Sequence, residues 1–169
     1  MNITGGIYKG RKITSPDEKI TRPTLSKTRM GVFNTLYSLI NSYENLSFLD
    51  LFGGSGIMGL EALSRGFGKV TVCELNKKSA QIIKSNYASL GLKPDLYIGD
   101  SLKLLNKFPQ SYDVTYIDPP FNSGIYKKII NQIKSGIIIA ESDINEDFSE
   151  YTVIKEKIYG SVKITFIKK

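Results

Sequence analysis

Four consecutive residues, Asp118-Pro-Pro-Phe121, combine groups that could bind a flat base carrying an amino group. The Asp118 carboxylate and the Pro119 carbonyl accept hydrogen bonds, and the Phe121 ring offers a face for stacking. Two acceptors on an amino group draw its lone pair out of the ring and make the nitrogen more nucleophilic. Because proline cannot continue a sheet or enter a helix interior, Pro119 and Pro120 hold a rigid loop. The tetrapeptide predicts chemistry at an exocyclic base amine, where positioning supplies up to ~7–11 kcal/mol.

A second group of residues is typical of a nucleoside-binding site. Gly54–Gly59 matches G-x-G-x-x-G directly after an apolar run, and glycine lets the backbone approach a ligand closely. Glu74, twenty residues after Gly54, ends the next apolar run, where its carboxylate could accept hydrogen bonds from both hydroxyls of a ribose. A nicotinamide dinucleotide uses the same geometry, with its pyrophosphate at the helix N-terminus. Asp50 favours a cationic ligand instead, because an acid so close to the loop would repel a pyrophosphate.

S-adenosylmethionine is a nucleoside that carries such cations, an ammonium and a sulfonium. A third acid, Asp100, follows another apolar run and could accept the amino group of adenine. The alternative for Asp100 is a plain N-cap of a helix that begins at Ser101.

The residue types in the chain exclude several other kinds of chemistry. Among the 169 residues there is no histidine and one cysteine, Cys73. A Ser-His-Asp or Cys-His site, a zinc site of the usual ligands and an intramolecular disulfide are therefore impossible, and no metal is expected. No stretch resembles a signal peptide or a membrane span, and a lone cysteine fits a reducing compartment. We expect a cytoplasmic protein.

Basic charge is concentrated at the two ends of the chain. The 23 basic and 16 acidic residues give a net charge of +7. Seven Lys and Arg residues and two acids lie in the first 30 residues, and five Lys and one Glu lie in the last fifteen. This pattern indicates a polyanionic partner, and RNA phosphates are the expected contacts of the N-terminal end. The charge pattern alone assigns no role to the basic C-terminal end.

These residues require an alternation of strands and helices to bring them together. Apolar runs predict strands at 47–52, 69–74, 96–99, 112–118 and 137–141, and helical spacing predicts helices at 26–40, 57–65, 76–90, 101–107 and 126–133. Two last runs, 152–158 and 162–167, alternate like an antiparallel pair. The pattern predicts an α/β fold: one doubly wound, Rossmann-like domain with a mostly parallel sheet and antiparallel edge strands at residues 25–169. A basic, hairpin-like extension at residues 1–24 precedes it.

The motifs together resemble one enzyme family. Asp50-Leu-Phe-Gly-Gly-Ser-Gly56, Glu74, Asp100 and Asp118-Pro-Pro-Phe121 are similar to successive motifs of class I S-adenosylmethionine-dependent amino-methyltransferases. Further segments resemble the RsmD family of 16S rRNA guanine-N2 methyltransferases: Ile3-Thr-Gly-Gly-Ile-Tyr-Lys-Gly-Arg-Lys12, Arg22-Pro-Thr24, Lys27-Thr-Arg29, Phe33-Asn34, Gly59-Leu-Glu-Ala-Leu-Ser-Arg-Gly66 and Tyr159-Gly160. The similarity covers essentially the whole chain.

The resemblance implies methyl transfer to N2 of a guanine in 16S rRNA, within an assembling or assembled small subunit, by a monomer without a membrane. Its implied catalytic residues are Asp118, Pro119, Pro120 and Phe121. The implied cofactor contacts are Asp50, Phe52, Gly53, Gly54, Ser55, Gly56, Glu74, Leu75, Asp100, Ser101 and Thr24. The implied RNA contacts are Lys9, Arg11, Lys12, Arg22, Lys27, Arg29 and Tyr126.

Two residues depart from the family pattern, and alternatives stay open. Gly53 replaces a usual Ala, which we expect to be harmless, and Met30 stands where an acid commonly follows the arginine. The same tetrapeptide would also serve adenine N6 or cytosine N4 in RNA or DNA. A non-catalytic RNA-binding module and a nicotinamide oxidoreductase are alternatives of other classes, disfavoured by the intact acids and by Asp50, respectively. Which nucleotide is modified is not predicted.

Overall fold

The apolar runs of the sequence form one seven-stranded sheet. The computed structural model describes residues 1–16, 24–108, 111–120 and 123–169. The strands are β1 (Ser47–Asp50), β2 (Lys69–Glu74), β3 (Asp95–Ile98), β4 (Tyr112–Ile117), β5 (Ser135–Asp143), β6 (Thr152–Tyr159) and β7 (Val162–Lys168). Their order in the sheet is β3-β2-β1-β4-β5-β7-β6; the first five are parallel, and β7 is antiparallel to both neighbours. The predicted α/β sheet with an antiparallel closing pair is confirmed.

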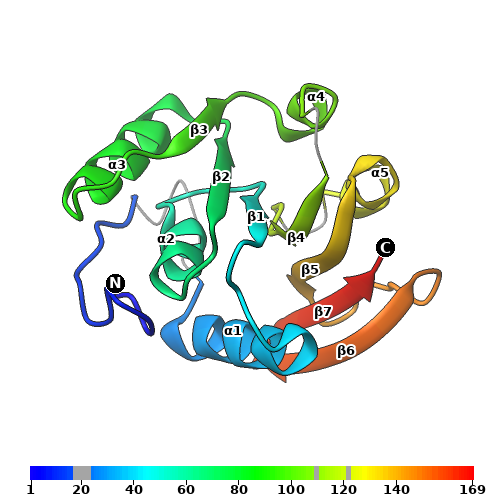
Figure 1. Cartoon of the computed structure of the whole chain (residues 1–169). Helices are drawn as coiled ribbons and strands as arrows, with labels where there is room; N and C mark the ends of the chain where they lie inside the picture. The colour runs from blue at the N-terminus through cyan, green and yellow to red at the C-terminus, as the bar shows by residue number, and fades with distance from the viewer. Residues whose placement is uncertain (17–23, 109–110, 121–122) are drawn as a thin grey trace.

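Helices cover both faces of the sheet (Figure 1). Successive strand residues point to opposite sides, so apolar strands place side chains that must be buried on both faces. Phe48 and Leu49, for example, are both fully buried but belong to two different cores. The first core is covered by α1 (Ser26–Ile40), α2 (Ile57–Ser64) and α3 (Lys77–Ala88). The second is covered by α4 (Ser101–Leu105) and α5 (Tyr126–Gln132).

The parallel strands bring the predicted functional residues to one edge of the sheet. Parallel strands end at the same edge, and ligands of such folds bind where the strand order reverses. Here the order reverses between β1 and β4, which are hydrogen-bonded neighbours. The carboxyl ends of these strands carry Asp50 and Asp118, and β2 ends at Glu74.

Residues 1–16 form an arm that packs on α2 and α3. One antiparallel bridge joins Asn2 to Lys12. Ile3 and Ile13 are buried in the first core, so the arm shares its core with the rest of the chain. The Thr4 amide donates to Glu61 of α2 at 2.7 Å, which fixes the arm to the helix that follows the glycine loop.

Candidate active site

The glycine loop between β1 and α2 is held by the neighbouring strand. The Gly53 amide donates to the carbonyl of Cys73 at 2.7 Å, and the Gly56 amide donates to the carbonyl of Gly53 at 2.6 Å. Gly54 and Gly56 adopt positive φ angles of 55° and 78°, which L side chains rarely adopt. The loop therefore turns sharply from strand to helix, and Gly54 is its one partly exposed residue between Gly53 and Gly56.

Gly53 is required by packing in this chain. A Cβ at this position would lie 2.5 Å from Cγ1 of Val72 and 3.0 Å from the carbonyl oxygen of Cys73. The glycine found in place of the family's Ala thus fits a core that leaves no room for a methyl group.

Asp50 is a buried carboxylate with an unused oxygen. Its exposed fraction is 1%. Oδ1 accepts a long hydrogen bond of 3.4 Å from the Phe52 amide, whereas Oδ2 has no partner among the described residues. Burial, the largest cause, and the nearby charge of Glu74 together raise the pKa of Asp50 to about 7, although backbone hydrogen bonds from Phe52 and Gly59 act in the opposite direction. A bound cation would relieve both penalties, so the donor set fits a cationic ligand beside the glycine loop.

Glu74 is oriented by two backbone amides. Oε2 accepts from the Gly54 amide at 2.7 Å, and Oε1 accepts from the Asn76 amide at 2.7 Å. A carboxylate oxygen has further acceptor capacity, so both oxygens remain able to accept ribose hydroxyls. The link to Gly54 also couples the position of this acid to that of the loop.

The other predicted cofactor residues lie around the same edge. Asp100 is exposed; its Oδ1 accepts from the Lys103 amide at 3.0 Å and caps α4, as the plain alternative expected. Its Oδ2 has no partner within the part of the chain that the structure describes, so an adenine contact stays a prediction. Leu75 is 68% exposed, Phe52 and Ser101 are half-buried, and Ser55 is buried. Their contacts with a cofactor also stay predictions.

Asp118 lies at the end of β4 beside two buried tyrosines. Asp118 is half-buried, Pro119 is buried and Pro120 is exposed, whereas Phe121 lies outside the described residues. Burial first, and then the neighbouring charges of Glu141 and Asp118, raise the pKa of Tyr116. Burial and then the charge of Asp118 likewise raise the pKa of Tyr126.

A buried network behind the tetrapeptide was missed from the sequence. Glu141 of β5 is 4% exposed, and its Oε2 accepts hydrogen bonds from the hydroxyls of Tyr116 and, at 3.3 Å, Thr24. Its carbonyl accepts from the Tyr126 hydroxyl at 2.6 Å. The hydroxyl of Thr24 is thus bonded to β5, and its predicted cofactor contact is untested. The signal was present, since Glu141 ends an apolar run as Glu74 does.

The structure buries the side chains of two residues that were predicted to contact RNA, Arg29 and Tyr126. Arg29 is 1% exposed, and its guanidinium is used by Glu61 (3.3 Å) and by the backbone carbonyls of Thr24 and Asn2. Tyr126 is 3% exposed and packs edge-on against Phe148, so it cannot stack on a base. Both side chains make contacts within the fold and are not exposed to a partner in this structure.

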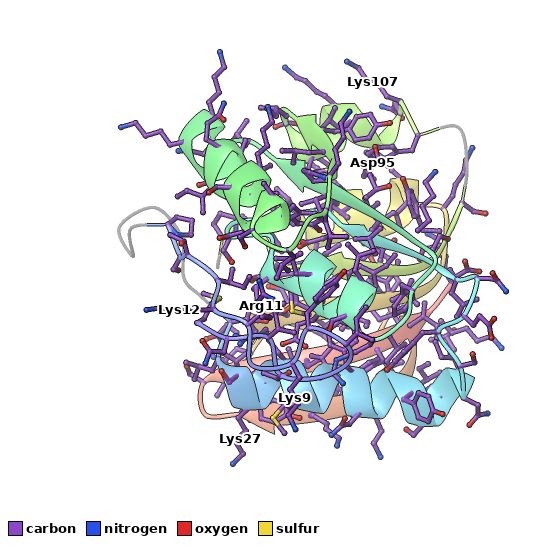
Figure 2. All side chains as sticks on the ribbon, turned by 60° about the vertical axis from the view of Figure 1, so that its left-hand side comes forward. Lys9, Arg11, Lys12, Lys27, Asp95 and Lys107 are labelled. Carbon is purple, nitrogen blue, oxygen red and sulfur yellow. The ribbon has the colours of Figure 1, made fainter. Side chains whose placement is uncertain are left out.

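The remaining basic candidates are positioned differently. Lys9, Lys12 and Lys27 are exposed, and Figure 2 shows them with Arg11 on the arm and on the first turn of α1. Arg11 is exposed as well, but one of its nitrogens donates to the carbonyl of Ser89. Arg22 lies outside the described residues. RNA contact by these residues stays a prediction.

The described ranges contain neither a metal-binding cluster nor a membrane-spanning helix. No group of three or more Cys, Asp or Glu side chains there could hold a metal ion. None of the helices there is long and apolar enough to cross a membrane.

The chain is similar to known proteins over almost its whole length. Residues 1–168 match the family model described as conserved hypothetical protein 95. A ribosomal RNA small subunit methyltransferase D from Haemophilus influenzae is 33% identical, over 96% of this chain and 90% of that protein. The protein of the same name from Escherichia coli is 29% identical, over 96% of this chain and 86% of that protein. The solved structure of a putative methyltransferase from Escherichia coli has a TM-score of 0.85 and 28% identity, covering 100% of this chain and 97% of that one. The chain therefore belongs to the conserved hypothetical protein 95 family, the RsmD family that its motifs indicated.

Proposed function

We propose that this protein transfers the methyl group of S-adenosylmethionine to the exocyclic N2 of a guanine in 16S rRNA. One observation supports the proposal most strongly: Asp50 and the acceptor loop at Asp118 lie at the ends of adjacent strands. Asp50 is buried, and its Oδ2 has no partner among the described residues. Asp50 suits a cationic cofactor and the acceptor loop suits an amine, so the two reactants would meet at one sheet edge.

The cofactor side of the reaction rests on three groups of this chain. S-adenosylmethionine supplies a methyl group on a positively charged sulfur. Asp50 would hold the cationic methionine portion, Glu74 the ribose, and Asp100 the adenine amino group. The half-buried Gly54, which has no side chain, would let the cofactor lie against the loop.

The substrate side rests on the tetrapeptide. Asp118 and the Pro119 carbonyl would accept the two hydrogens of the guanine amino group. The nitrogen lone pair would then form the bond to the methyl carbon as the carbon–sulfur bond breaks, with the electron pair of that bond staying on the sulfur, and one N–H proton would pass to the Asp118 carboxylate that accepts its hydrogen bond. Because that proton is lost only after the nitrogen becomes positively charged, acceptors suffice and a histidine base is not needed. The target guanine must be unstacked or single-stranded, since the loop cannot reach into a duplex.

RNA as the substrate is supported by charge and by the relatives. The chain carries a net charge of +7, and the relatives from Haemophilus influenzae and Escherichia coli are named for methylation of small-subunit ribosomal RNA.

Labelled methyl transfer tests the proposal. Small ribosomal subunits and naked 16S rRNA from a strain lacking this activity are incubated with the protein and labelled S-adenosylmethionine, and the RNA is digested to nucleosides. We expect N2-methylguanosine, its loss in Asp118→Ala, and its retention in Asp147→Ala, which removes an exposed carboxylate far along the chain. Labelled N6-methyladenosine or N4-methylcytidine would overturn the base assignment. RNA binding without label would favour a non-catalytic module.

A further inference from the structure

The basic C-terminal strands form a surface beside the candidate active site. Strand β6 is the last in the sheet, and within the described residues it pairs only with β7. All but one of its eight residues are exposed, and Tyr159 is half-buried. Both faces of this edge strand are therefore available to a partner.

A β-bulge sorts the charges of β6 by face. The pairing with β7 shifts by one residue between Val153 and Lys155. Side chains directly opposite each other in a sheet share a face, and a shift of one residue moves every following side chain to the other face. After the bulge, Lys155 lies opposite Phe166 and Lys157 opposite Ile164, two residues of the core that α1 covers. The lysines therefore point to the side of α1.

The one acid of β6 points the other way. Glu156 pairs with Thr165, whose hydroxyl donates to Glu156 Oε1 at 3.2 Å, and Lys163 lies 3.9 Å from the same oxygen. Without the bulge, Glu156 would face α1 and the two lysines would face away. The extra residue thus places Lys155 and Lys157 in a row on the α1 side of β6, where the strand has no acid. It places Glu156 on the other side, next to Lys163.

Helix α1 extends this row. A Cβ at Gly31 would overlap the Tyr159 hydroxyl, so the end of β6 lies directly against the helix backbone there. Lys27 is exposed one turn before Gly31, and Figure 2 shows it pointing outward at the lower edge of the view. Helix α1 contains no Asp or Glu. Among the described residues, no carboxylate forms an ion pair with the lysines at 27, 155 or 157.

The lysine row ends at the edge of the sheet that carries Asp118. Val162 of β7 pairs with both Tyr159 and Asp143, so the end of β6 lies level with the carboxyl end of β5. Lys157 is two residues back from that end, about 7 Å along the strand, and β4 is three strand spacings away, about 14 Å. A strand of RNA with one nucleotide at Asp118 could reach this row with its flanking phosphates.

From this placement we propose that the α1–β6 face binds the phosphodiester backbone of the substrate RNA next to the target nucleotide. This face consists of Lys27, Lys155 and Lys157. The inference rests on the proposed RNA substrate. Both RNA and an anionic membrane would complement the positive charge. The row is continuous with the edge of the sheet at which the substrate nucleotide would bind, and this favours RNA. Phosphate contacts of this kind supply affinity and register without reading sequence.

The test compares two double variants in steady-state methylation of the same ribosomal substrate. Lys155→Ala/Lys157→Ala should raise KM for RNA about tenfold at physiological salt and reduce the slope of log KM against log salt by about 1.4–1.8, one increment per lost phosphate contact. The value of kcat and the affinity for S-adenosylmethionine should stay unchanged. Lys103→Ala/Lys107→Ala removes two exposed lysines at or after α4, on the other face of the sheet, and should match the wild type.

The outcomes separate this inference from the proposed function. If the wild-type protein labels RNA and the Lys155→Ala/Lys157→Ala protein has the same KM and salt slope, the inference is overturned and the proposed function stands. If the wild-type protein labels no RNA, the proposed function fails. Should the double variant aggregate through its edge strand, Lys27→Ala decides, and an unchanged KM there overturns the inference. Loss of binding to anionic vesicles without loss of RNA affinity would also overturn it.

Discussion

Replacing Asp50 by Asn should stabilise the protein at neutral pH and weaken its binding of the cofactor. Burial raises the pKa of Asp50 from 3.8 to about 7 in the folded state. Because the folded pKa lies above the unfolded one, the folded state binds more protons between these two values, and stability falls as pH rises through that window. The shift of about three units corresponds to roughly 4 kcal/mol of lost stability above pH 7.

The size of the gain follows from what Asn keeps and loses. Its amide oxygen can still accept from the Phe52 amide, but its NH₂ group replaces Oδ2, which has no described partner. Leaving that group unpaired costs about 1–3 kcal/mol, so the net gain at pH 8 is about 1–3 kcal/mol. The difference between variant and wild type should grow by about 3 kcal/mol from pH 5 to pH 8, since the amide cost is the same at both.

Urea unfolding at pH 5 and pH 8 measures this difference, and calorimetric titration measures the cofactor. Asp50→Asn should weaken binding of S-adenosylmethionine by about 10–100-fold, the value of a hydrogen bond to a charged group. Wild-type affinity should fall as pH drops below about 7, because protonation removes the anion. Asp147→Asn, an exposed carboxyl whose pKa is lowered by hydrogen bonds from Ser149, should show no change between the two pH values. An Asp50→Asn gain that is equal at pH 5 and pH 8, or unchanged cofactor affinity, would refute the reasoning.

Three further substitutions test the packing around the site, each by urea or thermal unfolding. Gly53→Ala should destabilise by about 1–3 kcal/mol because its Cβ would lie 2.5 Å from Val72 Cγ1; an unchanged midpoint would contradict this. Arg29→Met should cost about 3–5 kcal/mol, since it removes a buried partner of Glu61; a loss below about 1 kcal/mol would argue against that role. Tyr87→Phe removes a buried hydroxyl with no described partner and should stabilise by about 1–3 kcal/mol, and a net loss would show that the hydroxyl is bonded.

The sequence predicts the fold and the strand-end acids well because those signals are local. An apolar run followed by an acid marks both a strand and its carboxyl end, and parallel strands bring such ends together whatever lies between them. Asp50, Glu74 and Asp118 were found in this way. Glu141 carries the same signal, but nothing local reveals that Tyr116 and Thr24 turn it into a buried network.

The sequence fails where a residue's environment depends on distant partners. Arg29 looks like the other basic residues of the N-terminal region. It becomes a core residue through its bonds to Glu61, 32 residues away, and to the carbonyls of Asn2 and Thr24. The bulge in β6 is another such feature. Alternation predicts an antiparallel pair, yet one extra residue decides on which face Lys155 and Lys157 lie. The position of the extra residue depends on how β6 pairs with β7, and no pattern within β6 alone predicts it.

Two buried acids of the first α/β unit show how a structural charge differs from one that awaits a ligand. Glu61 is fully buried, but Arg29, Arg65 and the Thr4 amide satisfy it, so its charge is compensated within the fold. Asp50 is almost as buried, keeps one oxygen without a described partner, and has the charge of Glu74 nearby in place of a cation. A fold selected for stability alone would not retain that arrangement, because an uncompensated buried charge costs several kcal/mol. The cost is explained if a cation completes the site, and this makes Asp50 the residue at which stability and activity should change in opposite directions.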